Sequence, residues 1–142
     1  MKFLILNGPN LNLLGIREPE IYGTETLDDI RDWLKRQADA NPHDITWFQS
    51  NHEGYLIDQV QESINLFDGI ILNPGALTHY SYALRDAIAS VQTPTIEVHL
   101  SKISDREDFR KISVIKDKCI SQISGLGKHV YLEAIKTLVN HL

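Results

Sequence analysis

Short apolar runs alternate along the chain with longer segments in which apolar residues recur every three or four positions. Apolar runs of this length are typical of buried β-strands. We expect five such strands, at residues 2–7, 45–49, 69–73, 95–100 and 119–124. The recurring positions are typical of amphipathic helices, of which four are expected. Their apolar positions are Leu27, Ile30, Trp33 and Leu34 in the first, Leu56, Ile57, Val60 and Ile64 in the second, Tyr80, Leu84, Ala87, Ile88 and Val91 in the third, and Leu132, Ile135, Leu138 and Val139 in the fourth.

The alternation of strand and helix predicts right-handed crossovers and a parallel sheet that is covered on both faces. The simplest such α/β architecture is flavodoxin-like, a doubly wound five-stranded parallel sheet in the order 2-1-3-4-5. That order makes the first, third and fourth strands neighbours. Open α/β folds bind ligands where the order reverses, at the carboxyl ends of the strands. We therefore expect the functional site in the segments that follow these three strands.

Composition favours one small domain, residues 1–142, because 42% apolar residues can form one core in a chain of this length. With 14 Lys and Arg against 19 Asp and Glu, the net charge of −5 argues against nucleic acid as a partner. The lone Cys119 is expected to be a buried apolar residue in a reducing compartment, which predicts the cytoplasm. No apolar run reaches the roughly 18 residues of a membrane helix, and the start of the chain turns polar too soon for a secretory signal.

Unusual polar residues gather in the expected segments. The connection after the first strand is long, from Asn7 to Gly23, and compact domains rarely keep such a connection without a function. Asn73 ends the third strand and His79 follows it. Taken one by one, these amides and imidazoles are typical of loop caps and turns. Together they indicate a site.

Glu97 and His99 lie two residues apart on the fourth strand and should point to the same face. A carboxylate beside an imidazole fixes its tautomer and raises its basicity, which suits a general acid. A histidine satisfied inside a helix–sheet core is the alternative for His99 taken alone.

Tyr22 is a candidate base, because Arg17 precedes it by five residues and Arg110 follows the fourth strand. A free phenol titrates near ~10, so a tyrosine base needs a nearby cation to favour the phenolate. A surface aromatic with solvated arginines is the alternative for these residues taken singly.

No cofactor is expected, since the chain has neither a GxxxxGK[ST] loop nor a GxGxxG turn after the first strand. No metal-ligand spacing such as HExxH occurs, although a metal-dependent hydrolase built from His79, His99 and Glu97 remains an alternative. A second alternative is a flavodoxin-like signalling or flavin module. A receiver domain, however, needs an acidic cluster where this chain has Asn7 and an aspartate where it has Asn73.

Four runs of sequence, in the same order, resemble the type II 3-dehydroquinate dehydratase family. They are NGPNLNLLGIREPEIYG at residues 7–23, QSNHEG at residues 49–54, residues 73–79 followed by 83–87, and EVHLS at residues 97–101. The resemblance covers nearly the whole chain. It implies a cofactor-free lyase that converts 3-dehydroquinate to 3-dehydroshikimate by anti elimination through an enolate. The step serves the shikimate pathway of aromatic biosynthesis or quinate breakdown.

The resemblance also implies roles for individual residues. Tyr22 would remove the proton α to the ketone, with Arg17 on a lid around residues 15–24. Asn10 would stabilise the enolate oxygen through an ordered water. His99, oriented by Glu97, would protonate the departing hydroxyl.

Substrate contacts follow by the same resemblance. Asn73 and the backbone amides of Leu100 and Ser101 would hold the substrate carboxylate, while His79 and Arg110 would contact the ring hydroxyls. A related enzyme class forms an imine through a lysine, but no lysine lies in the motif segments after the first and third strands.

Assembly is implied as well. Asp86 matches a residue that reaches a neighbouring subunit's site in a family that builds a homododecamer from trimers. The chain departs from the family pattern at residues 101–106, at Val114 and at residues 128–131, where Val130 replaces a glycine. These changes bear on loop geometry, assembly and substrate affinity.

Overall fold

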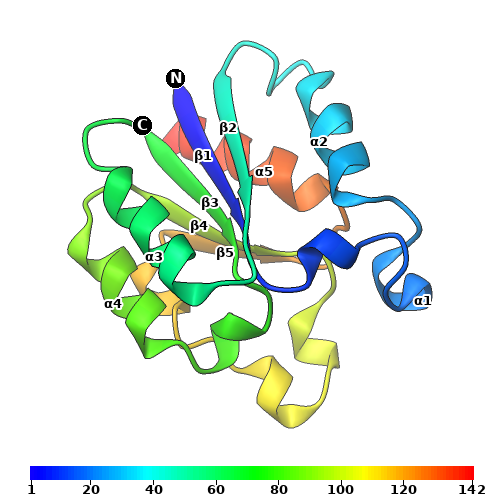
Figure 1. Ribbon diagram of the computed structural model, residues 1–142. Coiled ribbons are helices and arrows are strands. Elements are labelled where there is room, and N and C mark those ends of the chain that lie inside the picture. The colour runs from blue at the N-terminus through cyan, green and yellow to red at the C-terminus, as the bar shows by residue number, and fades with distance from the viewer.

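One parallel sheet of five strands forms the centre of the computed structural model (Figure 1). The structure describes residues 1–20 and 23–142 in full, and for residues 21 and 22 it gives only their place in a helix. The strand order is β2-β1-β3-β4-β5, which confirms the expected flavodoxin-like order 2-1-3-4-5. The strands are β1 (Lys2–Asn7), β2 (Asp44–Gln49), β3 (Gly69–Asn73), β4 (Thr95–His99) and β5 (Ser121–Ser124).

Helices cover both faces of the sheet, so that the fold has three layers (Figure 1). One face carries α2 (Leu27–Lys35) and α5 (His129–His141), and the other carries α3 (Glu53–Glu62) and α4 (Tyr82–Ser90). A short helix, α1 (Pro19–Tyr22), and the 3-10 turns η1 (Leu11–Leu13), η2 (Gly75–His79), η3 (Ile103–Asp105), η4 (Asp108–Lys111) and η5 (Lys116–Lys118) complete the structure. In the described residues, no helix has the length and apolar content to span a membrane.

Successive side chains of a buried strand point to opposite faces of the sheet, so the protein has two separate cores. The first core lies between the sheet and α2 and α5, and the second lies between the sheet and α3 and α4. In β1, Phe3 and Ile5 pack with α2 and α5, whereas Leu4 and Leu6 pack with α3 and α4. All four side chains are fully buried. A strand that is apolar on both faces is what a doubly covered parallel sheet requires.

The expected elements are largely confirmed, but three expected helix positions are wrong. Val91 follows the end of α4 in an extended conformation, although its side chain is buried. Ser81 accepts a hydrogen bond from the Leu84 amide and caps α4, so the helix begins at Tyr82 and leaves Tyr80 outside it and 61% exposed. Ile64 lies beyond the end of α3 and is half exposed.

Cys119 was expected to be buried, and its side chain is partly buried. This burial raises the pKa of the Cys119 thiol to about 12.

Two backbone segments meet where β1 and β3 end. The amide of Gly8 donates to the Asn73 carbonyl at 2.8 Å, and a Cβ on Gly8 would lie 2.6 Å from the Pro74 carbonyl oxygen. Only a glycine fits such an approach without moving backbone. Gly75 has φ +59° and faces Pro9 from the other side of the contact. The two segments that leave β1 and β3 are therefore held against each other.

We expect Gly8→Ala to destabilise the protein by about 1–3 kcal/mol, because the added methyl group must push one backbone segment away from another. Gly54→Ala, in α3, is the matched control, since a Cβ there meets nothing within 4 Å and alanine favours a helix. Urea unfolding of both variants measures the difference. Equal stability of the two variants would show that the Gly8 contact is not tight.

Candidate active site

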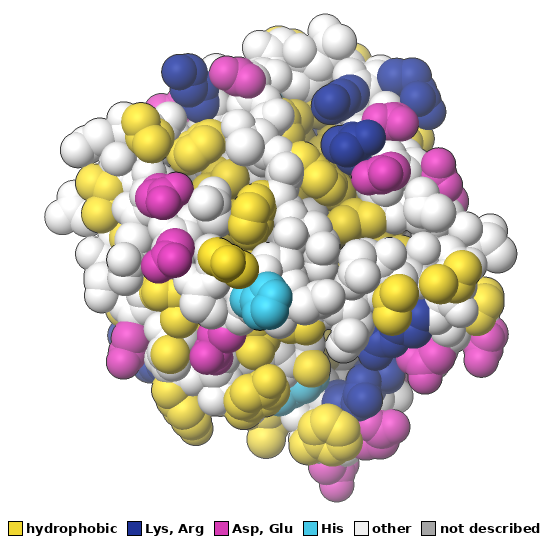
Figure 2. All heavy atoms as spheres, in the orientation of Figure 1, with side chains coloured by type: hydrophobic (Ala, Val, Ile, Leu, Met, Phe, Trp, Pro, Cys, Tyr) yellow, Lys and Arg dark blue, Asp and Glu magenta, His cyan; other side chains and the backbone are white. Residues whose placement is uncertain are grey.

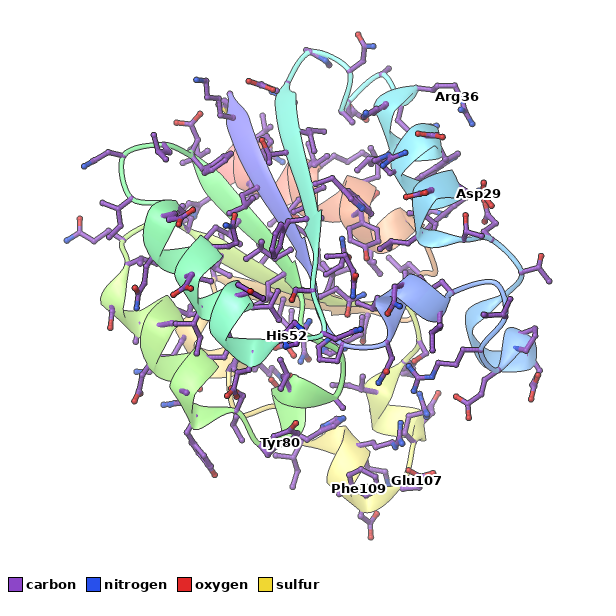
Figure 3. All side chains as sticks on the ribbon, in the orientation of Figure 1. Asp29, Arg36, His52, Tyr80, Glu107 and Phe109 are labelled. Atoms are coloured by element: carbon purple, nitrogen blue, oxygen red, sulfur yellow. The ribbon has the colours of Figure 1, made fainter. Side chains whose placement is uncertain are left out.

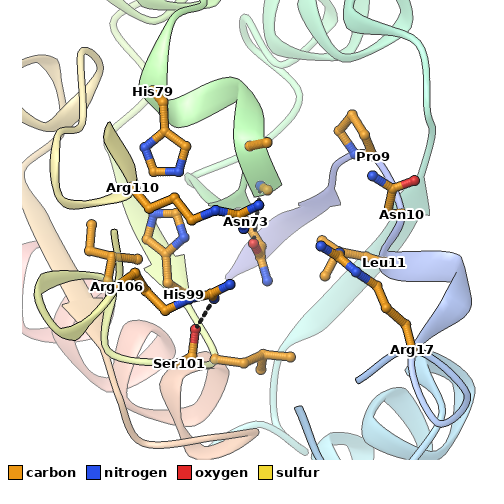
Figure 4. Close-up of a pocket in the computed structure, with 14 residues that line it drawn as sticks. Pro9, Asn10, Leu11, Arg17, Asn73, His79, His99, Ser101, Arg106 and Arg110 are labelled. Carbon is orange, nitrogen blue, oxygen red and sulfur yellow. Dashed lines mark hydrogen bonds between the residues drawn. The ribbon is translucent and has the colours of Figure 1, made fainter. Parts of the chain in front are cut away.

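A pocket lies at the carboxyl ends of β1, β3 and β4, where the order of the strands predicts a ligand site (Figure 4). The segment after β1, the η2 turn after β3 and the η3–η4 segment after β4 all contribute to it. Its lining residues are Pro9, Asn10, Leu11, Arg17, Asn73, Gly75, Ala76, His79, His99, Leu100, Ser101, Ile103, Arg106 and Arg110.

Most of the residues expected at the site line this pocket. They are Asn10, Arg17, Asn73, His79, His99, Leu100, Ser101 and Arg110. Glu97 is fully buried beside His99 and does not line the pocket itself. Asp86 is exposed on α4 and is not among the lining residues. The side chain of Tyr22, the expected base, lies outside the described residues.

The pair Glu97 and His99 has the geometry that their spacing predicts. His99 Nε2 lies 2.6 Å from Glu97 Oε1, and both side chains are buried. Because the ionised carboxylate can only accept, Nε2 carries the hydrogen of this bond. Nδ1 of His99 is then the ring atom that is left to exchange a proton with a ligand.

Two hydroxyl groups complete the surroundings of the Glu97 carboxylate. Thr78 donates to Oε1, and Ser113 Oγ lies 3.0 Å from Oε1 and 2.9 Å from Oε2. Burial acts to raise the pKa of Glu97, but the hydrogen bonds from His99, Thr78 and Ser113 outweigh it and hold the pKa below its ordinary value. Glu97 therefore stays ionised at neutral pH.

His79 is oriented by the backbone. Its Nδ1 lies 2.7 Å from the Ile112 carbonyl oxygen, so Nδ1 carries a hydrogen and donates it. The Phe109 ring meets the imidazole edge to face at 5.9 Å, and the Arg110 guanidinium lies 5.1 Å from the centre of the same ring. Arg110 Nε is also 2.7 Å from Glu107 Oε2. His79 and Arg110 are thus both positioned by the η4 segment.

Three arginines enter the pocket from two segments. Figure 4 shows Arg17 reaching in from the segment after β1, and Arg106 and Arg110 from the segment after β4. Arg106 donates to Ser101 Oγ at 3.4 Å. Basic side chains also gather on this part of the molecular surface (Figure 2). The pocket is locally cationic and suits an anion, although the chain has a net charge of −5.

Arg106 was not among the residues singled out from the sequence. Its position four residues before Arg110, in the same segment after β4, was the available signal. Thr78 and Ser113 were also missed, because each lies far along the chain from Glu97 and no spacing rule connects them.

The QSNHEG run holds the loop that carries Asn10. Asn51 Oδ1 accepts from the Asn10 amide at 2.9 Å and from Gln49 Nε2 at 3.2 Å, and Gln49 Nε2 also donates to the Gly8 carbonyl. These bonds fix Asn10 in a left-handed conformation with φ 69°. Two motifs that are distant in sequence therefore form one unit at the rim of the pocket.

The donor groups give no support to the metal alternative. His79 Nδ1 faces a backbone carbonyl and His99 Nε2 faces Glu97, so these nitrogens do not converge. Within the described part of the chain, no three His, Cys, Asp or Glu side chains are grouped so as to hold a metal ion. The described lining of the pocket contains no lysine that could form an imine.

Comparisons with known proteins agree with this geometry. The family model for dehydroquinase class II matches residues 1–139. The 3-dehydroquinate dehydratase of Anoxybacillus flavithermus is 55% identical over 140 residues, which are 99% of this chain and 95% of that protein. The enzyme of the same name from Bacillus subtilis is 53% identical over 138 residues, which are 97% and 93% of the two chains.

A solved structure is similar throughout. The crystal structure of the type II dehydroquinase from Butyrivibrio crossotus matches with a TM-score of 0.94 and 48% identity, covering 98% of this chain and 97% of the other. The family's sequence pattern therefore extends over the strands, the pocket and the last helix. On this ground, the chain belongs to the dehydroquinase class II family.

Proposed function

We propose that this protein is a 3-dehydroquinate dehydratase, a hydro-lyase that converts 3-dehydroquinate to 3-dehydroshikimate in this pocket. The relatives that bear this name cover nearly the whole chain. One observation carries the proposal: a single cationic pocket brings together the oriented His99–Glu97 pair, Asn10, Asn73 and three arginines. Such a site can bind a carboxylate and stabilise the negative charge of an enolate.

The first step is removal of the proton α to the ketone, which we assign to Tyr22 acting as a phenolate. Arg17 lies five residues earlier in the same segment and lines the pocket. A guanidinium near the phenol favours the charged form of the tyrosine. We propose that residues 15–24 form a lid that brings Tyr22 to the bound substrate.

The enolate that forms needs a donor at its oxygen. Asn10 lines the pocket, and Asn51 holds its backbone. Its side-chain amide is suited to stabilise the enolate oxygen through an ordered water. Because Asn10 is held before the substrate binds, little reorganisation accompanies the transfer of charge.

The second step is loss of the hydroxyl group. The electron pair of the enolate returns to form the carbon–carbon double bond, the carbon–oxygen bond breaks, and His99 Nδ1 gives a proton so that water leaves. The ionised Glu97 stabilises the imidazolium that donates this proton. Tyr22 and His99 act on opposite faces of the ring, which gives an anti elimination.

Binding is assigned to the remaining polar groups. We propose that Asn73 and the backbone amides of Leu100 and Ser101 hold the carboxylate of the substrate. His79 and Arg110 are oriented by the η4 segment and are suited to contact the ring hydroxyls.

We also propose that the protein assembles into trimers and then into a dodecamer, with Asp86 reaching a neighbouring subunit's site. Asp86 and Tyr82 lie four residues apart on α4 and share one helix face, where Tyr82 is 65% exposed. Tyr80, also exposed, and Phe109 point away from the sheet on the same side of the molecule (Figure 3). An exposed apolar surface of this kind fits a second copy of the chain.

We propose a cytoplasmic location as well, and the half-buried free thiol of Cys119 fits a reducing compartment of this kind.

Turnover is the direct test of the reaction. With 3-dehydroquinate and a chelator present, we expect a rise in the ultraviolet absorbance of the conjugated enone. Tyr22→Phe and His99→Ala should each lower kcat by a factor of about 10² to 10⁴, because each removes a proton-transfer group.

Matched controls are Tyr55→Phe, on the exposed face of α3, and His141→Ala, at the end of α5, and both should keep full activity. Absence of turnover in folded wild-type protein would contradict the proposal. Inactivation by chelator alone would favour a metal enzyme, and inactivation by borohydride with substrate would favour an imine.

The state of Glu97 predicts a dependence of stability on pH. Its lowered pKa means that its stabilising contribution is present above the ordinary carboxyl pKa of about 4.3 and is lost as the pH falls through the folded value. We expect Glu97→Gln to lower the free energy of unfolding by about 1.5–3 kcal/mol at neutral pH. The difference from wild type should shrink below about pH 4.

Denaturant unfolding between pH 3 and 7 measures this difference. Glu62→Gln, at an exposed position of α3, is the control and should leave stability nearly unchanged. If the difference in the free energy of unfolding between wild type and Glu97→Gln stays constant with pH, Glu97 is not held in its charged form.

Light scattering after size exclusion tests the assembly, with an expected mass of about twelve times the 16.2 kDa of one chain. Tyr82→Lys places a charge on the exposed face of α4 and should yield smaller species. Ile64→Lys, beyond the end of α3, should leave the mass unchanged. A monomeric wild-type protein would rule out the proposed assembly.

A further inference from the structure

A continuous line of buried hydrogen bonds lies behind the pocket and ends at Asn73. Asn7 Nδ2 donates to the Phe48 carbonyl at 3.3 Å, and the Tyr131 hydroxyl donates to Asn7 Oδ1 at 2.6 Å. Asn73 Nδ2 donates in turn to the Tyr131 oxygen at 3.2 Å, and the Gly75 amide donates to Asn73 Oδ1 at 3.3 Å. The line therefore joins β2, β1, α5 and β3.

Its members are shielded from water. Asn7 and Tyr131 are fully buried, and Asn73 is 2% exposed. Asn7 and Asn73 are direct neighbours in the pairing of β1 with β3. Each polar group in such a place needs a partner, since a buried and unpaired donor or acceptor is costly.

The direction of every bond in the line is fixed by backbone groups at its two ends. The Phe48 carbonyl can only accept, so Asn7 must present Nδ2 to it and turn Oδ1 toward Tyr131. The single hydroxyl proton of Tyr131 is then used on Asn7, so its oxygen can only accept from Asn73. At the other end, the Gly75 amide can only donate, which also requires Oδ1 of Asn73 on that side.

We infer that Tyr131 and Asn7 are positioning residues that hold the Asn73 amide with an N–H directed to the pocket, and that this orientation selects a ligand carrying a carboxylate. The inference rests on the proposed function, in which Asn73 binds the substrate carboxylate. Asn73 Nδ2 uses one hydrogen on Tyr131, and the second is left for the pocket that Asn73 lines. A reversed amide would present its oxygen to the carboxylate and repel it.

Core packing alone does not account for a tyrosine at this position. The ring packs in the first core, with its centre 5.2 Å from the centre of the Trp47 ring, and a phenylalanine would make the same contacts. The hydroxyl is the part of the side chain that the hydrogen-bond line needs. Burial raises the pKa of the Tyr131 phenol well above its usual value, so this hydroxyl stays protonated over the working range of pH.

The test is Tyr131→Phe, which keeps the ring and removes the hydroxyl. We expect KM for 3-dehydroquinate to rise roughly tenfold, because only the long bond from the Gly75 amide then orients the Asn73 amide, while kcat changes by less than about twofold. In the Asn73→Ala background, the same substitution should leave KM unchanged. A merely structural effect of the hydroxyl would appear in both backgrounds.

Two further variants complete the design. Asn7→Ala frees the Tyr131 proton to turn toward Asn73 and should also raise KM, which gives a second route if Tyr131→Phe does not fold. Ser63→Ala removes a buried hydroxyl from a different part of the fold, where its Oγ donates to the Val60 carbonyl, and should lower stability without changing KM.

The inference and the proposed function fail in different ways. No turnover by the wild-type protein would remove the proposed function. A Tyr131→Phe enzyme with wild-type KM, or one whose KM rises equally in the Asn73→Ala background, would overturn the inference while leaving the reaction in place. Calorimetric binding of 3-dehydroquinate in a His99→Ala background, where turnover is slowed, should show the same roughly tenfold weakening.

Discussion

A charged carboxylate without any exposed surface is the constraint on which the site depends. Glu97 lies on β4, an interior strand of the sheet, where an unpaired buried charge would be strongly unfavourable. Its partners come from β4 itself, from the η2 turn through Thr78, and from the segment before η5 through Ser113. The need to pair one charge thus draws together three segments that are far apart in sequence.

The same hydrogen bonds organise the neighbouring loops. The hydroxyl oxygens of Thr78 and Ser113 lie 2.9 Å apart, and the Thr78 carbonyl accepts from the Val114 amide at 2.7 Å. The segment held in this way continues back to Ile112, which orients His79, and to Arg110. The binding side of the pocket therefore depends on the same contacts that keep Glu97 ionised and His99 oriented.

The sequence was sufficient for the sheet and for most of the pocket. The apolar runs are long enough to identify the strands, and the order of strands then determines which segments meet at their carboxyl ends. The same order predicts that Asn10, Asn73 and His99 lie in one region, and all three line the pocket. Helix ends were less predictable, because a single cap such as Ser81 overrode the apolar spacing and excluded Tyr80.

Contacts between distant residues could not be predicted in the same way. Nothing in the spacing of Thr78, Ser113 and Tyr131 reveals that their hydroxyls share partners with the site, since serine, threonine and tyrosine occur in many structural settings. The positions at which the chain departs from the expected family pattern are partly buried in the structure. Val130, at the position where the resemblance implies a glycine, is fully buried in the core with α2 and α5, and Ile103 is buried within segment 101–106.

The bond between Tyr131 and Asn7 spans 124 residues, from the first strand to the last helix. Contacts of such sequence separation form late, because a long loop must close before they are made. During synthesis, the first strand emerges from the ribosome long before its partner on α5 exists. The hydrogen-bond line behind Asn73 is complete only when α5 docks on the sheet, so this wall of the pocket depends on the last helix of the fold.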